Sequence, residues 1–194
     1  MRVRLDEQVA ALGHSIFGCL VFTSLLLMVA MTGRQWTVQS KGRATRLIMF
    51  AAFIVPAVCL GQYGIGGVVR HFGGLLHEHV AGAVAVVIAT FVALYASRRN
   101  GHDAVRRAGF RFSVAVVVQI IIGCAVWITK LGLPSAQLVA VQHSMPQILA
   151  RSVHTVAGMA VVSTSILWGI TVWRVSEPVQ LFSTRLVSRS GIST

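Results

Sequence analysis

The stretch from Gly61 to Ala83, GQYGIGGVVRHFGGLLHEHVAGA, decides the fold. It joins the end of one long apolar run to the start of the next through a turn only a few residues wide, and it carries three of the chain's seven histidines. A chain that spans lipid must satisfy its own backbone hydrogen bonds, so two apolar runs joined in this way predict a helical hairpin inside a bilayer. The histidines are then expected at the mouth of that hairpin.

The composition extends this prediction to the whole chain. Hydrophobic residues make up 55% and charged residues 11%, whereas charged residues alone account for about 25% of an average soluble domain. The basic residues that produce the net charge of +12 occur in short clusters between apolar runs, which argues against a nucleic-acid partner and for contact with membrane lipid. Cys19, Cys59 and Cys124 all lie inside apolar runs, so we expect small buried side chains rather than disulfides.

Five segments reach the roughly 20 residues that a helix needs to cross the hydrocarbon core. The predicted fold is therefore all-α, a polytopic transmembrane bundle with helices at about 10–32, 47–69, 78–97, 111–130 and 151–174. We expect residues 1–175 to form this domain and residues 176–194 to form a polar cytoplasmic tail. The loop at about 131–150 contains Pro134 and Pro146, and it is either a short interfacial helix or a plain connector.

The basic residues also predict the orientation. Three groups fall in loops that alternate helices place on one side, and together they hold twelve of the seventeen basic residues: Arg34, Lys41, Arg43, Arg46; Arg98, Arg99, Arg106, Arg107, Arg111; and Arg174, Arg185, Arg189. Cytoplasmic loops carry this excess, so the N-terminus is expected outside and the C-terminus inside. The predicted location is the inner (cytoplasmic) membrane, crossed several times.

Three histidines are predicted at similar depth near the outer face, each within the first turn or so of the first, third or fifth helix. Each precedes a small residue by four positions, on the same helix face: His14 with Gly18, His79 with Ala83, and His154 with Gly158. A flat macrocycle ligated by the imidazole would fit beside such a notch. Close helix packing at small residues is the competing interpretation.

The donor set favours haem over zinc. A zinc site normally adds a carboxylate or thiolate, whereas two neutral imidazoles from facing helices suit six-coordinate haem iron. His77 and His79 are both candidate ligands, and the spacing to Ala83 favours His79. Arg70 and Arg151 either pair with haem propionates or anchor the helix ends at the headgroups.

The second and fourth predicted helices share a Gln-x-x-x-Gly spacing near the same outer end. It runs from Gln62 to Gly66 and from Gln119 to Gly123, and a histidine-bearing helix follows each copy. The chain therefore holds two copies of a two-helix unit, and the first helix corresponds to the second half of another unit.

Four segments resemble the haem A synthase family: GQYGIGGVVRH, HEHVAGA, VVQIIIG and SVHTVAGM. Members have eight helices in two similar halves, and this chain is similar to their last five. The resemblance implies that His79 and His154 ligate a haem b, and that His14 contributes to the site where the haem O methyl is oxidised to the formyl of haem A. That function would link the chain to cytochrome oxidase assembly.

The family's first three helices have no counterpart here, so the resemblance implies one complete bis-histidine site and half of another. A partner subunit or a homo-oligomer would have to complete the second site. The leading interpretation is thus a haem A synthase-like oxidoreductase component whose catalytic half is incomplete. The alternatives are a non-catalytic b-type cytochrome that transfers electrons in the membrane, and a structural subunit of a respiratory complex without haem.

Overall fold

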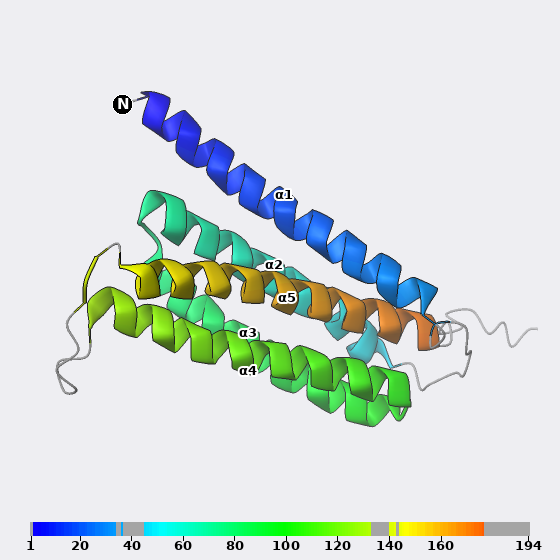
Figure 1. The fold of residues 1–194 in the computed structure, drawn as a ribbon. Helices are drawn as coiled ribbons and strands as arrows, with labels where there is room; N and C mark the ends of the chain where they lie inside the picture. The colour runs from blue at the N-terminus through cyan, green and yellow to red at the C-terminus, as the bar shows by residue number, and fades with distance from the viewer. Residues whose placement is uncertain (1, 34–35, 37–44, 133–139, 143, 177–194) are drawn as a thin grey trace, which may run out of the picture.

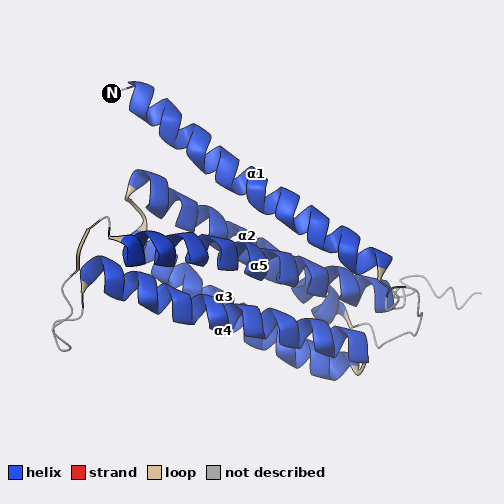
Figure 2. Cartoon of the chain, in the orientation of Figure 1, coloured by secondary structure: helices blue, strands red, loops and turns tan. Residues whose placement is uncertain are grey.

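The computed structural model describes residues 2–33, 36, 45–132, 140–142 and 144–176. These residues form five α-helices joined by loops, and no strand occurs in the described part of the chain (Figure 2). The helices are α1 (Arg2–Thr32), α2 (Arg46–Phe72), α3 (Leu76–Asn100), α4 (Asp103–Leu131) and α5 (Met145–Val175). All five are long and apolar enough to cross a membrane, which confirms the predicted multi-pass helical bundle.

Helices α2 to α5 form an up-and-down four-helix bundle. Contacts run from α2 to α3, α3 to α4, α4 to α5, and back from α5 to α2, which closes the ring. Helix α1 packs outside this ring against α5 and α2. Figure 1 shows α1 at an angle to the bundle, with its N-terminal end well away from the other helices.

The hairpin between α2 and α3 begins and ends with local signals. Thr45 caps α2 by accepting a hydrogen bond at its hydroxyl oxygen from the Ile48 amide at 3.3 Å. Gly73 then ends α2 in the left-handed conformation at φ 75°, which glycine adopts without strain. Leu75 takes a positive φ of 61° at the start of α3, so the reversal is compressed into Gly73–Leu75. The tight hairpin predicted from Gly61–Ala83 is confirmed.

Helices α2 and α5 approach closely around a proline. Pro56 lies inside α2, where it lacks the amide that would otherwise bond the Ala52 carbonyl. A Cβ built on Gly169 of α5 would lie only 2.5 Å from that carbonyl oxygen and 3.4 Å from the Pro56 ring. Glycine at this position therefore lets the two backbones touch.

The bundle is densely packed in the half near the α3–α4 loop. Trp168 and Phe112 are completely buried there, and the Trp168 indole donates to the Ser97 hydroxyl at 2.8 Å. A Cβ on Gly109 would lie 2.6 Å from the same hydroxyl oxygen. Large side chains fill this half and the helices approach closely at small residues, so the space that remains in the bundle lies towards the α2–α3 turn.

Some of the predicted helix starts need correction. Helices α1 and α5 begin at Arg2 and Met145, well before the predicted starts at 10 and 151, and α5 takes Pro146 into its first turn. His102 is the N-cap of α4, where its Nδ1 accepts a hydrogen bond from the Ala104 amide at 3.1 Å. Residues 177–194 of the predicted tail lie outside the described residues, as do residues 133–139 and 143 of the predicted 131–150 loop, whose residues 145–150 belong to α5.

Candidate functional site

A cavity of about 510 Å³ occupies the bundle half near the α2–α3 turn. Pockets for small molecules and cofactors typically measure about 300–1,000 Å³. All five helices contribute to its wall, which is mostly aliphatic, and its polar groups are few. The main polar side chains that line it are Gln62, Tyr63, Arg70, His79, Gln119, Lys130, Arg151, His154 and Thr155.

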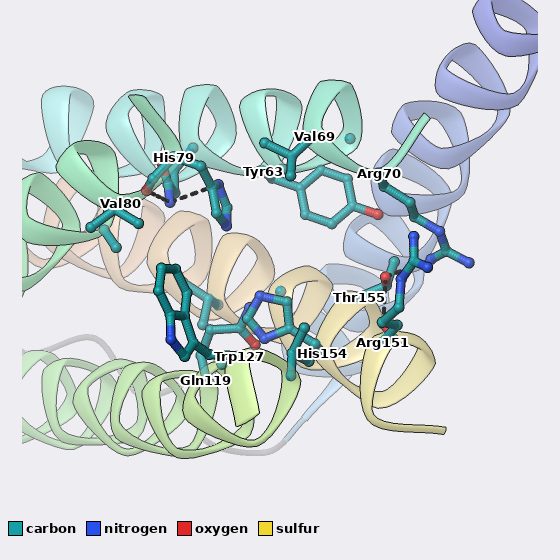
Figure 3. Close-up of a pocket in the computed structure, with 18 of the residues that line it drawn as sticks. Tyr63, Val69, Arg70, His79, Val80, Gln119, Trp127, Arg151, His154 and Thr155 are labelled. Carbon is teal, nitrogen blue, oxygen red and sulfur yellow. Dashed lines mark hydrogen bonds between the residues drawn. The ribbon is translucent and has the colours of Figure 1, made fainter. Parts of the chain in front are cut away.

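His79 of α3 and His154 of α5 project into this cavity (Figure 3). Their ring centroids are 6.4 Å apart and their planes are inclined at 81°. An imidazole nitrogen binds a first-row metal at about 2.0–2.1 Å and lies about 1.2 Å from its ring centroid, so two imidazoles on opposite sides of one metal place their centroids about 6.3 Å apart. The observed separation therefore agrees with that expected for two ligands of one metal, and it also lies in the range of about 4.5–7 Å for an edge-to-face pair of rings.

Each of these imidazoles is contacted by a glutamine amide of the preceding helix, at a different ring nitrogen in each case. The Gln62 amide nitrogen of α2 lies 3.1 Å from His79 Nδ1, and the Gln119 amide nitrogen of α4 lies 3.3 Å from His154 Nε2. A Cβ on Gly66 would lie 2.9 Å from the His79 ring, and a Cβ on Gly123 would lie 3.3 Å from the His154 ring. The Gln-x-x-x-Gly repeat of the sequence thus forms, in each copy, a surface whose glutamine amide and glycine backbone contact a histidine ring.

The small residues that follow the histidines face these glutamines. A Cβ on Gly82 would collide with the Gln62 amide oxygen, and one on Gly158 would lie 3.5 Å from the Gln119 amide nitrogen and 3.2 Å from the Tyr63 ring. The spacing of four residues had paired His79 with Ala83, but it is Gly82 that lies close to Gln62. Ala83 and Gly158 also line the cavity, so both interpretations of the notches, packing and ligand space, have structural support.

Arg70 and Arg151 lie close together at one end of the cavity, on either side of Thr155 (Figure 3). Arg70 donates to the Thr155 hydroxyl at 2.6 Å, and both guanidinium groups are exposed. Within the described ranges the one carboxylate ion pair joins Arg106 to Asp103 at the other end of the bundle. The two arginines therefore have no acidic partner there and form a positive edge to an otherwise apolar cavity.

Neither His14 nor His77 lines the cavity. His77 is exposed on α3, so the choice of His79 over His77 agrees with the side-chain positions. His14 is exposed and lies twelve residues into α1, so its predicted place in the first turn is wrong, as is that of His154, nine residues into α5. His71 Nε2 lies 3.4 Å from the Ser15 hydroxyl on α1. His143 lies outside the described residues.

The cysteine prediction is correct for two residues out of three. Cys19 and Cys59 are buried free thiols, whereas Cys124 is exposed beside the cavity. Sequence reasoning also missed Tyr63 and Trp127, which line the cavity. Tyr63 follows Gln62 directly in the stretch that decided the fold, and its hydroxyl donates to the Ser15 carbonyl of α1 at 3.3 Å.

The side chains that line the cavity suit a metal ion already coordinated by a prosthetic group better than a bare metal ion. Among the residues that the structure describes, no group of three or more His, Cys, Asp or Glu side chains could hold a bare metal ion. Two facing imidazoles can, however, complete a metal whose equatorial positions are already filled, as in a porphyrin. His154 Nδ1 is moreover buried without a hydrogen-bond partner, which leaves one ring nitrogen available for such a bond.

Fold and site together define a multi-pass membrane protein with two facing histidines in an apolar cavity. Comparison with known proteins adds no relative: no family model matches the chain, and no curated protein or solved structure matches it significantly. The likeness to the haem A synthase family therefore depends on the short motifs and on the site residues that they contain.

Proposed function

We propose that the chain binds haem b between His79 and His154 and acts as a haem A synthase-like oxidoreductase component of the inner membrane. The observation that carries the proposal is the 6.4 Å separation of the two imidazole centroids across the cavity, which suits axial ligation from opposite faces. The apolar wall supports it, because it would cover the faces of a macrocycle and exclude water.

Arg70 and Arg151 would orient the group. A haem carries two propionates on one edge, and guanidinium groups bind carboxylates with paired, charge-assisted hydrogen bonds. The two arginines lie at the same end of the cavity and lack an acidic partner in the described part of the chain. This arrangement would place the propionate edge at the outer end of the bundle and the opposite edge towards the packed half.

The haem supplies the redox chemistry, and the protein supplies ligation, orientation and exclusion of water. In the haem A synthase-like role, a haem b held by His79 and His154 would supply electron transfer for oxidation of the haem O methyl at a second site. His14 is the residue of this chain assigned to that second site by the resemblance. It is exposed on α1, so a homo-oligomer or a partner subunit would have to cover it.

The first experiment is the optical spectrum of detergent-purified protein, oxidised and reduced, with His79→Ala and His154→Ala variants. A low-spin haem b spectrum is expected from the unmodified protein, and either substitution should abolish the six-coordinate form. His77→Ala is the matched control, because this side chain lies on the same helix as His79 but is exposed and outside the cavity, so the spectrum should stay unchanged. A colourless protein purified from cells with ample haem would refute the site.

A second candidate, a non-catalytic b-type cytochrome, is favoured by the position of His14. Of the three helix histidines, His14 alone has no glutamine contact and no place on the cavity wall among the described residues. An assay of haem A formation with candidate partner subunits present distinguishes the two. Haem A formation supports the synthase-like role, whereas a reversible one-electron haem signal without any change in the haem side chains supports the cytochrome.

A further inference from the structure

The two glutamines that hold the histidines are not equivalent. The Gln62 amide nitrogen donates to the His79 backbone carbonyl at 2.8 Å. A carbonyl oxygen can only accept, so this contact fixes which end of the Gln62 amide faces His79. The same nitrogen lies 3.1 Å from His79 Nδ1, so Nδ1 is the acceptor and the ring proton resides on Nε2.

Among the described residues, no comparable backbone contact fixes Gln119. Its amide nitrogen lies 3.3 Å from His154 Nε2, and its amide oxygen, like that of Gln62, is buried without a partner. A half-turn about the last side-chain bond exchanges the nitrogen and oxygen, which have nearly the same size. Gly158 leaves room for that turn, because even a Cβ there would stay 3.5 Å from the amide nitrogen.

This difference matters once an imidazole binds a metal. A ligating imidazole keeps a proton on its other nitrogen, and that N–H is normally given to an acceptor, which fixes the ring and strengthens the ligand. Gln119 can present its oxygen to His154 without breaking another described hydrogen bond. Gln62 cannot do the same for His79, because the turn would place its oxygen against the carbonyl oxygen that its nitrogen now contacts.

We infer that the two histidines would bind the haem iron with unequal strength. His154 is the stronger ligand and His79 is the ligand that can be exchanged. Gln62 is a positioning residue that causes this difference, because it donates to the His79 ring nitrogen that should itself carry a proton. The inference rests on the proposed haem site and deepens it. The iron face on the His79 side is then the face at which a small diatomic molecule can replace an imidazole.

Carbon monoxide binding to the dithionite-reduced protein tests this inference. In the unmodified protein, carbon monoxide should displace one imidazole and shift the Soret band. Gln62→Leu, which has a similar size but no amide donor, should bind carbon monoxide several-fold more weakly because His79 is freed to ligate. The matched variant Gln119→Leu should bind it at least as tightly as the unmodified protein, because its change weakens the other ligand.

The two histidine variants give an independent reading. His79→Ala should retain most of its haem as a five-coordinate, high-spin form on His154, whereas His154→Ala should lose most of its haem during purification. If both histidine variants retain haem equally, or if Gln62→Leu binds carbon monoxide as tightly as the unmodified protein or more tightly, the two ligands are not unequal and the inference is wrong. In that case a low-spin spectrum of the unmodified protein would still support the proposed haem site. An unmodified protein without haem would overturn both.

Discussion

The sharpest test of the site geometry is the substitution Gly66→Ala. The new Cβ would lie 2.9 Å from His79 Cε1, whereas carbon atoms pack comfortably at about 3.5–4.0 Å. The imidazole must therefore retreat by about 0.6–1 Å, while metal–ligand distances tolerate only about ±0.2 Å. Changes in residues that orient a ligand typically cost about 10–100-fold in metal affinity, or about 1.4–2.8 kcal/mol. We expect Gly66→Ala to fall at the upper end of that range.

The assay is a titration of haem-depleted, detergent-solubilised protein with haemin, followed by low-spin absorbance. Gly123→Ala should lose less affinity, about tenfold at most, because its Cβ would lie 3.3 Å from the His154 ring. Gly64→Ala is the control. Gly64 lies on the same helix as Gly66, and a Cβ there would have no neighbour within 4 Å. This variant therefore reports only the gain in helix propensity of about 1 kcal/mol. If Gly66→Ala binds haem as tightly as Gly64→Ala, the proposed position of the imidazole is wrong.

Three further substitutions probe the rest of the bundle. Gly169→Ala places a Cβ 2.5 Å from the Ala52 carbonyl oxygen, so it should separate α5 from α2 and lower the free energy of unfolding by about 1–3 kcal/mol; an unchanged melting temperature in detergent would contradict this contact. Trp168→Phe removes the indole donor to Ser97 and should cost about 1–3 kcal/mol in the same melting assay, while haem affinity measured by titration stays constant. His77→Ala should leave haem content and spectrum unchanged, because the side chain is exposed and outside the cavity; a loss of haem would move the ligand assignment to His77.

Hydropathy predicted the existence and number of helices well but placed some of their ends poorly. Apolar length identifies the part of a helix that lies in hydrocarbon, yet backbone hydrogen bonding continues into the polar headgroup region and beyond. The first turns of α1, from Arg2, and of α4, from Asp103, carry charged residues, so they fell outside the predicted spans. His14 was consequently placed too near a helix start.

Topology predicted that His14, His79 and His154 lie at similar depth, and the family resemblance selected His79 and His154 from these three as a pair; their ring centroids lie 6.4 Å apart. The contacts of these histidines could be predicted only in part. The Gln-x-x-x-Gly repeat was visible in the sequence, but its function required knowing that α2 packs on α3 and α4 on α5 with those faces inward. The distinction between Gln62 and Gln119 depends on one backbone carbonyl, and sequence spacing holds no information about such a contact.

The three helix histidines differ in their surroundings, and this difference limits which part of the proposed chemistry the described residues could support. His79 and His154 are each approached by a glutamine amide and by a glycine of the preceding helix, and both face the same cavity. His14 has neither contact in the described part of the chain, and a Cβ built on Gly18, one turn later, would lie 4.0 Å from Met159 Cε of α5. Under the proposed function, the described residues would therefore supply both ligands and the polar support for one haem, and they show no comparable site around His14 for a second haem. We expect a reversible one-electron haem signal from the purified chain, because that signal would depend on the first site alone, and we expect haem A formation to increase when a component that covers the exposed His14 is added.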